Sequence, residues 1–294
     1  MRFAPVAALL ASILVLAEHA SAVESSPWGD SAEAASVEKD ISYANGGDQQ
    51  KLDLYLPRQK NFPTVVFVYG GGWHSGSRKG VAAVGKKLQS LGYGCALLSH
   101  RLAPKDKFPA QIEDVAAGFA WVKKHIAEKG GDPKRTFIMG HSSGAHLSAL
   151  LACDPRYLAV HDLSPSDIAG VVGLSAIVDL EPKKDGTGFG NVLVANPRMD
   201  VFAKDADSLR NASPIQHVRK GLPPVLLVVG ERDFPMLRAD GQAFVEKAKV
   251  AGGSARLFVA KGRDHMGVVQ ALLKDEDPVV QQVTVFLGAP NTLK

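Results

Sequence analysis

Two kinds of hydrophobic pattern alternate along the chain, one typical of strands and one typical of helices. Short apolar runs rich in β-branched residues predict buried strands, and apolar residues repeated every three to four positions predict helices. The predicted strands cover residues 51–56, 64–69, 94–99, 136–139, 168–174, 224–229 and 255–259. The predicted helices cover residues 81–91, 109–130, 145–153, 236–250 and 279–287.

This alternation predicts an α/β fold with a mostly parallel sheet that is covered by helices on both faces. The strand at 64–69 is apolar throughout, as a strand covered on both faces should be. In such sheets the active residues lie on loops beyond the carboxyl ends of the strands. Residues from about 175 to 222 carry several Gly, Pro, Asn and Asp residues and little periodicity, and we interpret them as a small cap-like insertion.

The N-terminal segment has a composition of its own. One positive charge at Arg2, an apolar stretch over residues 4–17 and a small-residue site ending at Ala22 predict a secretory signal peptide over residues 1–22. The apolar stretch is too short for a stable membrane span. We therefore expect a secreted or periplasmic protein with one domain over residues 23–294, beginning with a loose arm to about residue 37.

Composition narrows the choice of partners. The net charge is +4, and the lysines are dispersed rather than gathered into a basic stripe, so a nucleic-acid partner is not expected. The only cysteines, Cys95 and Cys153, are interpreted as small buried residues rather than as a disulfide. No metal-ligand motif occurs, and the glycines at 186–190 lack dinucleotide spacing, so neither a metal nor a cofactor is expected. The pattern does not indicate an oligomeric state.

The pentapeptide Gly140-His141-Ser142-Ser143-Gly144 lies between a predicted strand and a predicted helix. A serine with glycine at both second neighbours, on a strand-to-helix turn, is typical of a nucleophile elbow. The turn strains the serine backbone, and side chains at the two glycine positions would collide with neighbouring elements. Ser142 is thus the candidate nucleophile, whereas His141 and His146 lie too close to it in sequence to be its base.

Three further motifs follow predicted strands. Tyr69-Gly70-Gly71-Gly72-Trp73 would expose backbone N–H groups that can stabilise an oxyanion. Asp233 follows the predicted strand at 224–229 as the candidate acid, and His265 follows the predicted strand at 255–259 as the candidate base. The three residues then occur in the chain order Ser, Asp, His. Asp179 is the alternative acid, and Asp264, which adjoins the histidine, is expected to cap a loop.

With these motifs the sequence resembles the α/β-hydrolase superfamily, near its carboxylesterase and lipase-like branches, which include hormone-sensitive-lipase-type and feruloyl-esterase-like enzymes. Two further motifs add to the resemblance: Arg-Leu-Ala-Pro at residues 101–104 and Phe-Pro-Ala-Gln at residues 108–111. It implies an oxyanion hole formed by the N–H groups of Gly71, Gly72 and Ser143. The usual first histidine of the glycine motif is Tyr69 here, which leaves open which two glycines point inward.

The expected activity is hydrolysis of short-chain or aryl carboxylic esters through an acyl-enzyme, with a small-molecule ester as substrate. An aryl formamidase or a serine peptidase would use the same triad, and a non-catalytic binding protein on this scaffold is a further alternative. Trp73 and Phe234 are candidate substrate contacts, and ordinary packing is the alternative role for each. The natural ester and its acyl length are not predicted.

Overall fold

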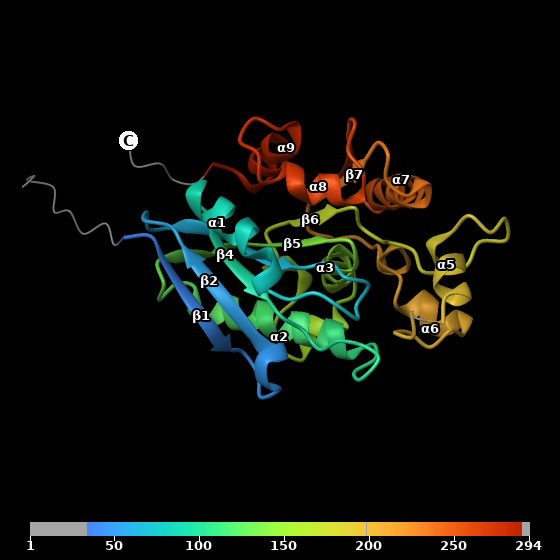
Figure 1. Cartoon of the computed structure of the whole chain (residues 1–294), viewed down its shortest axis with the longest axis horizontal. Helices are drawn as coiled ribbons and strands as arrows, with labels where there is room; N and C mark the ends of the chain where they lie inside the picture. Colours follow the sequence, from blue (N-terminus) through green and yellow to red (C-terminus); the bar gives the residue numbers. More distant parts are fainter. Residues whose placement is uncertain (1–33, 198, 290–294) are drawn as a thin grey trace, which may run out of the picture. The chain divides into compact units, whose positions relative to one another are not determined.

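The computed structural model describes residues 34–289 except Arg198, so the predicted signal peptide lies outside the described residues. One eight-stranded sheet has the order β1-β2-β4-β3-β5-β6-β7-β8 (Figure 1). β1 and β2 pair antiparallel, and all pairs from β4 to β8 are parallel. The strands are β1 (Ser36–Ser42), β2 (Lys51–Leu56), β3 (Phe62–Val68), β4 (Gly94–Leu98), β5 (Gly131–His141), β6 (Val171–Leu174), β7 (Val225–Gly230) and β8 (Ala255–Ala260).

Helices cover both faces of this sheet. Alternate residues of β3 enter two different cores: Val66 and Val68 pack with α2, α3 and α7, while Val65 and Phe67 pack with α1, α8 and α9. The helices are α1 (Ala82–Ser90), α2 (Ala110–His125), α3 (Ser143–Cys153), α4 (Arg156–Ala159), α5 (Phe189–Ala195), α6 (Ala206–Asn211), α7 (Pro235–Val250), α8 (His265–Ala271) and α9 (Pro278–Leu287). The predicted α/β fold with helices on both faces is confirmed.

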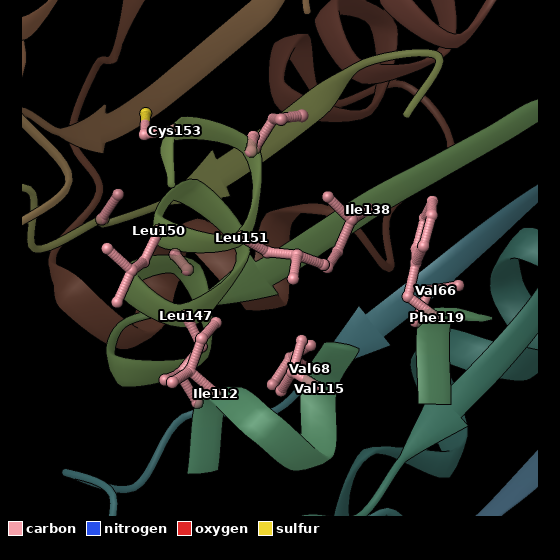
Figure 2. Close-up of a cluster of buried hydrophobic side chains, with 14 of the residues drawn as sticks. Val66, Val68, Ile112, Val115, Phe119, Ile138, Leu147, Leu150, Leu151 and Cys153 are labelled. Atoms are coloured by element: carbon pink, nitrogen blue, oxygen red, sulfur yellow. The ribbon is translucent and has the colours of Figure 1, made fainter. Parts of the chain in front are cut away.

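The core between α2, α3 and the sheet fixes the two central strands (Figure 2). Full burial of each of its large apolar side chains stabilises the folded state by about 1.5–3 kcal/mol. The fully buried members drawn there include Val66, Val68, Ile112, Val115, Phe119, Ile138, Leu147, Leu150 and Leu151. Because β3 and β5 run straight into the glycine motif and the pentapeptide, this core holds both motifs in place. Cys153 lies in the same cluster, and neither it nor Cys95 is in a disulfide.

Several boundaries differ from the sequence-based expectation. β1 begins at Ser36, inside the predicted loose arm, and most of its side chains are exposed, so it lacks the apolar alternation that marks a strand. β5 extends further toward the N-terminus than residues 136–139, and β6 is confined to Val171–Leu174. α8 was not predicted, since only Val268 and Ala271 of its seven residues are buried.

The segment 175–222 contains α5 and α6, which Figure 1 shows in yellow and orange at one end of the sheet. Its return half is hydrogen-bonded both to α7 and to the rest of the segment. Lys247 of α7 donates a hydrogen bond from Nζ to the Ile215 carbonyl at 2.8 Å. The Ser213 hydroxyl accepts a hydrogen bond from the Leu180 N–H at 2.8 Å and donates one to the Leu209 carbonyl at 2.8 Å. Lys183, further out in the segment, forms an ion pair with the buried Asp240 of α7.

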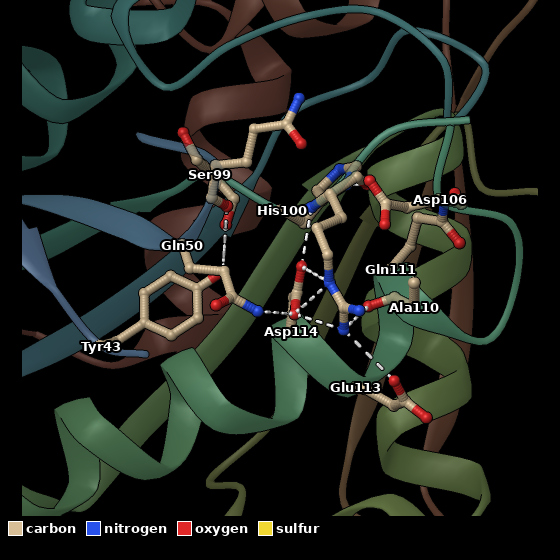
Figure 3. A network of polar contacts seen from close by, with 11 residues as sticks. Tyr43, Gln50, Ser99, His100, Asp106, Ala110, Gln111, Glu113 and Asp114 are labelled. Carbon is tan, nitrogen blue, oxygen red and sulfur yellow. Dashed lines mark hydrogen bonds and ion pairs between the residues drawn. The ribbon is translucent and has the colours of Figure 1, made fainter. Parts of the chain in front are cut away.

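The Arg-Leu-Ala-Pro motif has a structural role. Arg101 donates to Asp114 of α2 from Nε at 3.0 Å and from Nη2 at 2.8 Å, and Gln50 donates to the same carboxylate at 2.6 Å. Tyr43 joins this network through its hydroxyl, which donates to the Ser99 carbonyl (Figure 3). The network fixes the loop that follows β4. Among the described residues, no helix is long and apolar enough to cross a membrane.

Candidate active site

Ser142 lies on the turn between β5 and α3, with φ 55° and ψ −120°. Positive φ is rare for a residue with a side chain and is strained. The two flanking glycines are required by close packing. A Cβ at Gly140 would lie 2.4 Å from the Gly144 carbonyl carbon, and one at Gly144 would lie 2.2 Å from the Val68 carbonyl oxygen. The turn therefore presents Ser142 in the way that the pentapeptide predicted.

The structure brings Ser142, His265 and Asp233 together at the carboxyl edge of the sheet. His265 Nε2 lies 2.9 Å from Ser142 Oγ, and His265 Nδ1 lies 2.8 Å from Asp233 Oδ1. Because an ionised carboxylate can only accept, Nδ1 carries the proton and Nε2 is free to take one from the serine hydroxyl. This is the geometry that a serine nucleophile with a histidine base requires.

The carboxylate of Asp233 has two donors besides His265. Ser175, at the end of β6, donates its hydroxyl to Oδ2 at 2.6 Å, and the Phe234 N–H donates to Oδ1 at 2.8 Å. Burial raises the pKa of Asp233, but these hydrogen bonds outweigh it and the pKa lies below its ordinary value. Sequence reasoning missed Ser175, whose positive φ of 52° is invisible in the sequence.

The other candidate acids have different partners. Asp264 accepts a hydrogen bond from the Gly267 N–H at 2.7 Å and caps α8, so the expected capping role is confirmed. Asp179 accepts one from the Glu181 N–H at 3.0 Å. The carboxylate that meets His265 is that of Asp233.

The glycine motif forms one wall of a pocket of about 360 Å³ that also contains Ser142 and His265. Gly71 and Gly72 have φ values of +145° and +63°, and their N–H groups have no hydrogen-bond partner within residues 34–289, Arg198 excepted. Ser143 begins α3, and the first N–H groups of a helix have no acceptor within it. Gly71 and Gly72 thus line the pocket that holds the nucleophile, and Ser143 directly follows the nucleophile in the chain. The apolar part of the lining consists of Phe67, Val81, Met266 and Val269.

The two candidate substrate contacts differ in position. Phe234 is 52% exposed, and its ring centroid lies 5.1 Å from that of His265. Neither residue lines the pocket, and Trp73 is fully buried, which fits the alternative that it is a packing residue. Its indole instead packs edge-on against Phe202 of the insertion, with ring centroids 4.9 Å apart.

His141 joins the nucleophile turn to the base. Its Nε2 lies 2.9 Å from the His265 carbonyl oxygen and must donate to it, so Nε2 carries a proton. Burial lowers the pKa of His141 to about 4, so the ring is neutral near pH 7 and adds no positive charge to the site. The expectation that His141 is a packing or loop-bonding residue is confirmed.

Larger cavities of about 480 and 610 Å³ lie beside α2, but they contain none of these residues. The site is therefore identified by its side-chain chemistry and not by the volume of its pocket. In the part of the chain that the structure describes, no group of three or more His, Cys, Asp or Glu side chains is placed to hold a metal ion.

A parallel sheet of this order, with a serine on a strand-to-helix turn, an acid after β7 and a histidine after β8, is an α/β-hydrolase fold. Comparison with protein families agrees, because the BD-FAE family model matches residues 52–247. The chain belongs to this family. The matched region includes Ser142 and Asp233 and ends before His265.

The individual proteins that this chain resembles include several esterases. Esterase LipC of Mycobacterium tuberculosis is 32% identical over 218 residues, which are 70% of this chain and 53% of LipC. The chain spans about half the length of the first curated relatives that it matches. A truncated carbohydrate esterase from gut microbiota has the same fold, with a TM-score of 0.72 at 21% identity over 87% of this chain and 96% of the other. An esterase of Pyrobaculum calidifontis has a TM-score of 0.70 at 27% identity, over 86% of this chain and 84% of the esterase.

Proposed function

We propose that the protein hydrolyses carboxylic esters through an acyl-enzyme. The observation that carries this proposal is the continuous hydrogen-bonded chain from Asp233 through His265 to Ser142, which opens into a pocket lined by free glycine N–H groups. The names of the relatives, esterases of several kinds, support the same reaction class.

The mechanism follows from the positions of the atoms. Ser142 Oγ attacks the ester carbonyl while His265 Nε2 takes its proton, and Asp233 stabilises the imidazolium that forms. The N–H groups of Gly71, Gly72 and Ser143 stabilise the tetrahedral oxyanion. His265 then gives its proton to the departing alcohol, and a water molecule, activated by the same imidazole, releases the acid.

An uncharged substrate suits the pocket. Its lining side chains are apolar apart from Ser142, His141 and His265, and no Asp, Glu, Lys or Arg is among the described residues that line it. We therefore propose a short-chain or aryl ester as the substrate class. We also propose that residues 1–22 are removed as a signal peptide and that the protein is secreted or periplasmic, on the strength of the N-terminal sequence pattern.

Hydrolysis of 4-nitrophenyl esters of increasing acyl length by the protein starting at Val23 tests this function. Ser142→Ala is expected to lower kcat on the acetyl and butyryl esters by about a thousandfold or more, because it removes the nucleophile. Ser148→Ala is the matched control, since it removes a buried hydroxyl that donates only to the Gly144 carbonyl within α3. It should retain wild-type kcat.

Labelling with an organophosphate separates the alternatives. A protein that is inactive on every ester but labelled at Ser142 would favour a formamide or peptide substrate. A protein that is neither active nor labelled would instead indicate a binding protein on this scaffold. Wild-type kcat in Ser142→Ala would refute the mechanism.

A further inference from the structure

The oxyanion loop, defined here as Gly70–Trp73, is held in an unusual backbone conformation. Three consecutive residues have positive φ: Gly71 at +145°, Gly72 at +63° and Trp73 at +63°. Glycine adopts such angles readily, but for a bulky residue they are strained. The conformation at Trp73 persists only if the surrounding structure imposes it.

The Trp73 side chain supplies that restraint. Its ring is fully buried among His146 of α3 and Phe189 and Phe202 of the insertion. Its Nε1–H donates to His146 Nδ1 at 3.1 Å, the one polar contact that an indole can make as a donor. The Trp73 carbonyl accepts the Ala103 N–H at 3.1 Å, so the backbone is also held at this position.

His146 has a single tautomer that fits both of its neighbours. Nδ1 must accept from the indole, so the proton is on Nε2, which donates to the Ala212 carbonyl at 2.8 Å. Burial lowers the pKa of His146 to about 4, and the ring therefore stays neutral and keeps Nδ1 as an acceptor near neutral pH. A protonated ring would lose that acceptor.

We propose that the Trp73–His146 hydrogen bond positions the oxyanion loop, so that Trp73 and His146 are positioning residues for the reaction although neither touches the substrate. The inference rests on the proposed function and extends it. The path runs from Ala212 of the insertion through His146 of α3, four residues beyond Ser142, to the residue that ends the glycine motif. It fixes the N–H groups of Gly71 and Gly72 relative to the nucleophile.

Three substitutions separate the contacts of the pair. Trp73→Phe keeps a buried ring and removes the donor. His146→Gln places an amide nitrogen near the position of Nε2, so it can donate to Ala212 but offers nothing at Nδ1. His146→Asn places an amide oxygen near Nδ1, so it can accept from the indole but loses the donor to Ala212.

The measurement is kcat and KM on 4-nitrophenyl acetate, together with the inhibition constant of an alkyl trifluoromethyl ketone, whose hemiketal with Ser142 carries an oxyanion. Trp73→Phe and His146→Gln should lower kcat by about 10- to 100-fold with KM nearly unchanged, because displaced donors are felt in the transition state. The inhibition constant should rise in parallel. His146→Asn should keep kcat within about threefold of the wild type, because the indole keeps its acceptor. Loss of an oxyanion donor would instead lower kcat by about a hundredfold or more.

The double variant Trp73→Phe/His146→Gln should be no slower than the slower single variant, because both remove the same contact. Circular dichroism and thermal unfolding establish that each variant is folded. If Trp73→Phe does not fold, the comparison of His146→Gln with His146→Asn, both with the indole intact, decides the question.

Two outcomes for kcat would overturn the inference while Ser142→Ala remains inactive: wild-type kcat in both Trp73→Phe and His146→Gln, or an equal loss of kcat in His146→Gln and His146→Asn. The proposed function would then still stand. If Ser142→Ala retained wild-type activity, the proposed function itself would fail, and with it the role of the loop. Unchanged inhibition constants alongside lowered kcat would also contradict an oxyanion role.

Discussion

Ser175 shows how a residue outside the triad contributes to it. Its hydroxyl donates to Asp233 Oδ2, on the opposite oxygen from the one that meets His265. The carboxylate is thereby held at both oxygens, which fixes its orientation and the orientation of the imidazole. Ser175 itself is fully buried, and its N–H donates to the Val228 carbonyl at 2.7 Å, so it has little freedom to move.

Ser175→Ala should lower kcat by about tenfold, since a hydrogen bond to a charged group contributes about 1.5–3 kcal/mol. KM should change little, because the substrate does not touch this hydroxyl. Steady-state kinetics on 4-nitrophenyl acetate measure both parameters. Ser148→Ala again serves as the buried-serine control, and equal kcat values for the two variants would contradict the role of Ser175.

Single residues were predictable where a local pattern marks them. Ser142 lies in a pentapeptide, and Asp233 and His265 each follow an apolar run, so all three follow from strand order. Ser175 and the pairing of Trp73 with His146 depend on contacts between residues 58 and 73 positions apart in the chain. No local periodicity encodes such contacts, which is why the sequence leaves Trp73 open between a substrate contact and a packing residue.

At the scale of elements, the elbow depends on the approach of α3 to β3. Gly144→Ala should destabilise the fold by about 3 kcal/mol or more, because its Cβ would meet the carbonyl oxygens of Val68 and Tyr69 at 2.2 and 2.4 Å, which are backbone atoms that cannot yield. Urea unfolding measures the loss. Gly80→Ala is the control, because its Cβ would have no neighbour closer than 3.5 Å. We expect it to change the free energy of unfolding by less than about 1 kcal/mol. Similar values for the two variants would refute the steric argument.

Elements with a strong apolar pattern were found from the sequence, and those without one were not. The parallel strands β3, β4, β6 and β7 are buried throughout, and each appears as an apolar run. β1 pairs on one side only and exposes most of its side chains. The insertion has short helices with only one or two buried residues each, Gly190 and Leu193 in α5 and Leu209 in α6, which are too few to produce a recognisable apolar period.

For the whole molecule, the buried neutral histidines predict a dependence of stability on pH. The pKa values of His141 and His146 are both lowered to about 4, against about 6.5 in an unfolded chain. As the pH falls below about 6.5, the unfolded state binds protons that the folded state does not, so the free energy of unfolding decreases until about pH 4. Each histidine contributes up to about 1.4 kcal/mol per pH unit in this window.

Urea unfolding across that pH range checks this dependence. His141→Gln and His146→Gln should each reduce the slope of the unfolding free energy against pH by about one proton, because glutamine does not titrate. Ser148→Ala provides the control, because it removes no titratable group and should leave the slope unchanged. A slope that none of these substitutions alters would assign the acid sensitivity to other groups.

The anchoring of the insertion has a consequence for how new specificities arise. Residues 206–222 fold back onto α3, and through Ala212 they reach the histidine that supports the oxyanion loop. Phe189 and Phe202 of the outer stretch, residues 181–205, pack against Trp73 of the same loop, so both halves of the insertion support it. Residues 184–187 are exposed and take no part in these contacts. Evolution, or a designer grafting loops between hydrolases, can vary such a turn while inheriting the catalytic apparatus intact, whereas exchanging the whole insertion would remove the side chains that hold Trp73.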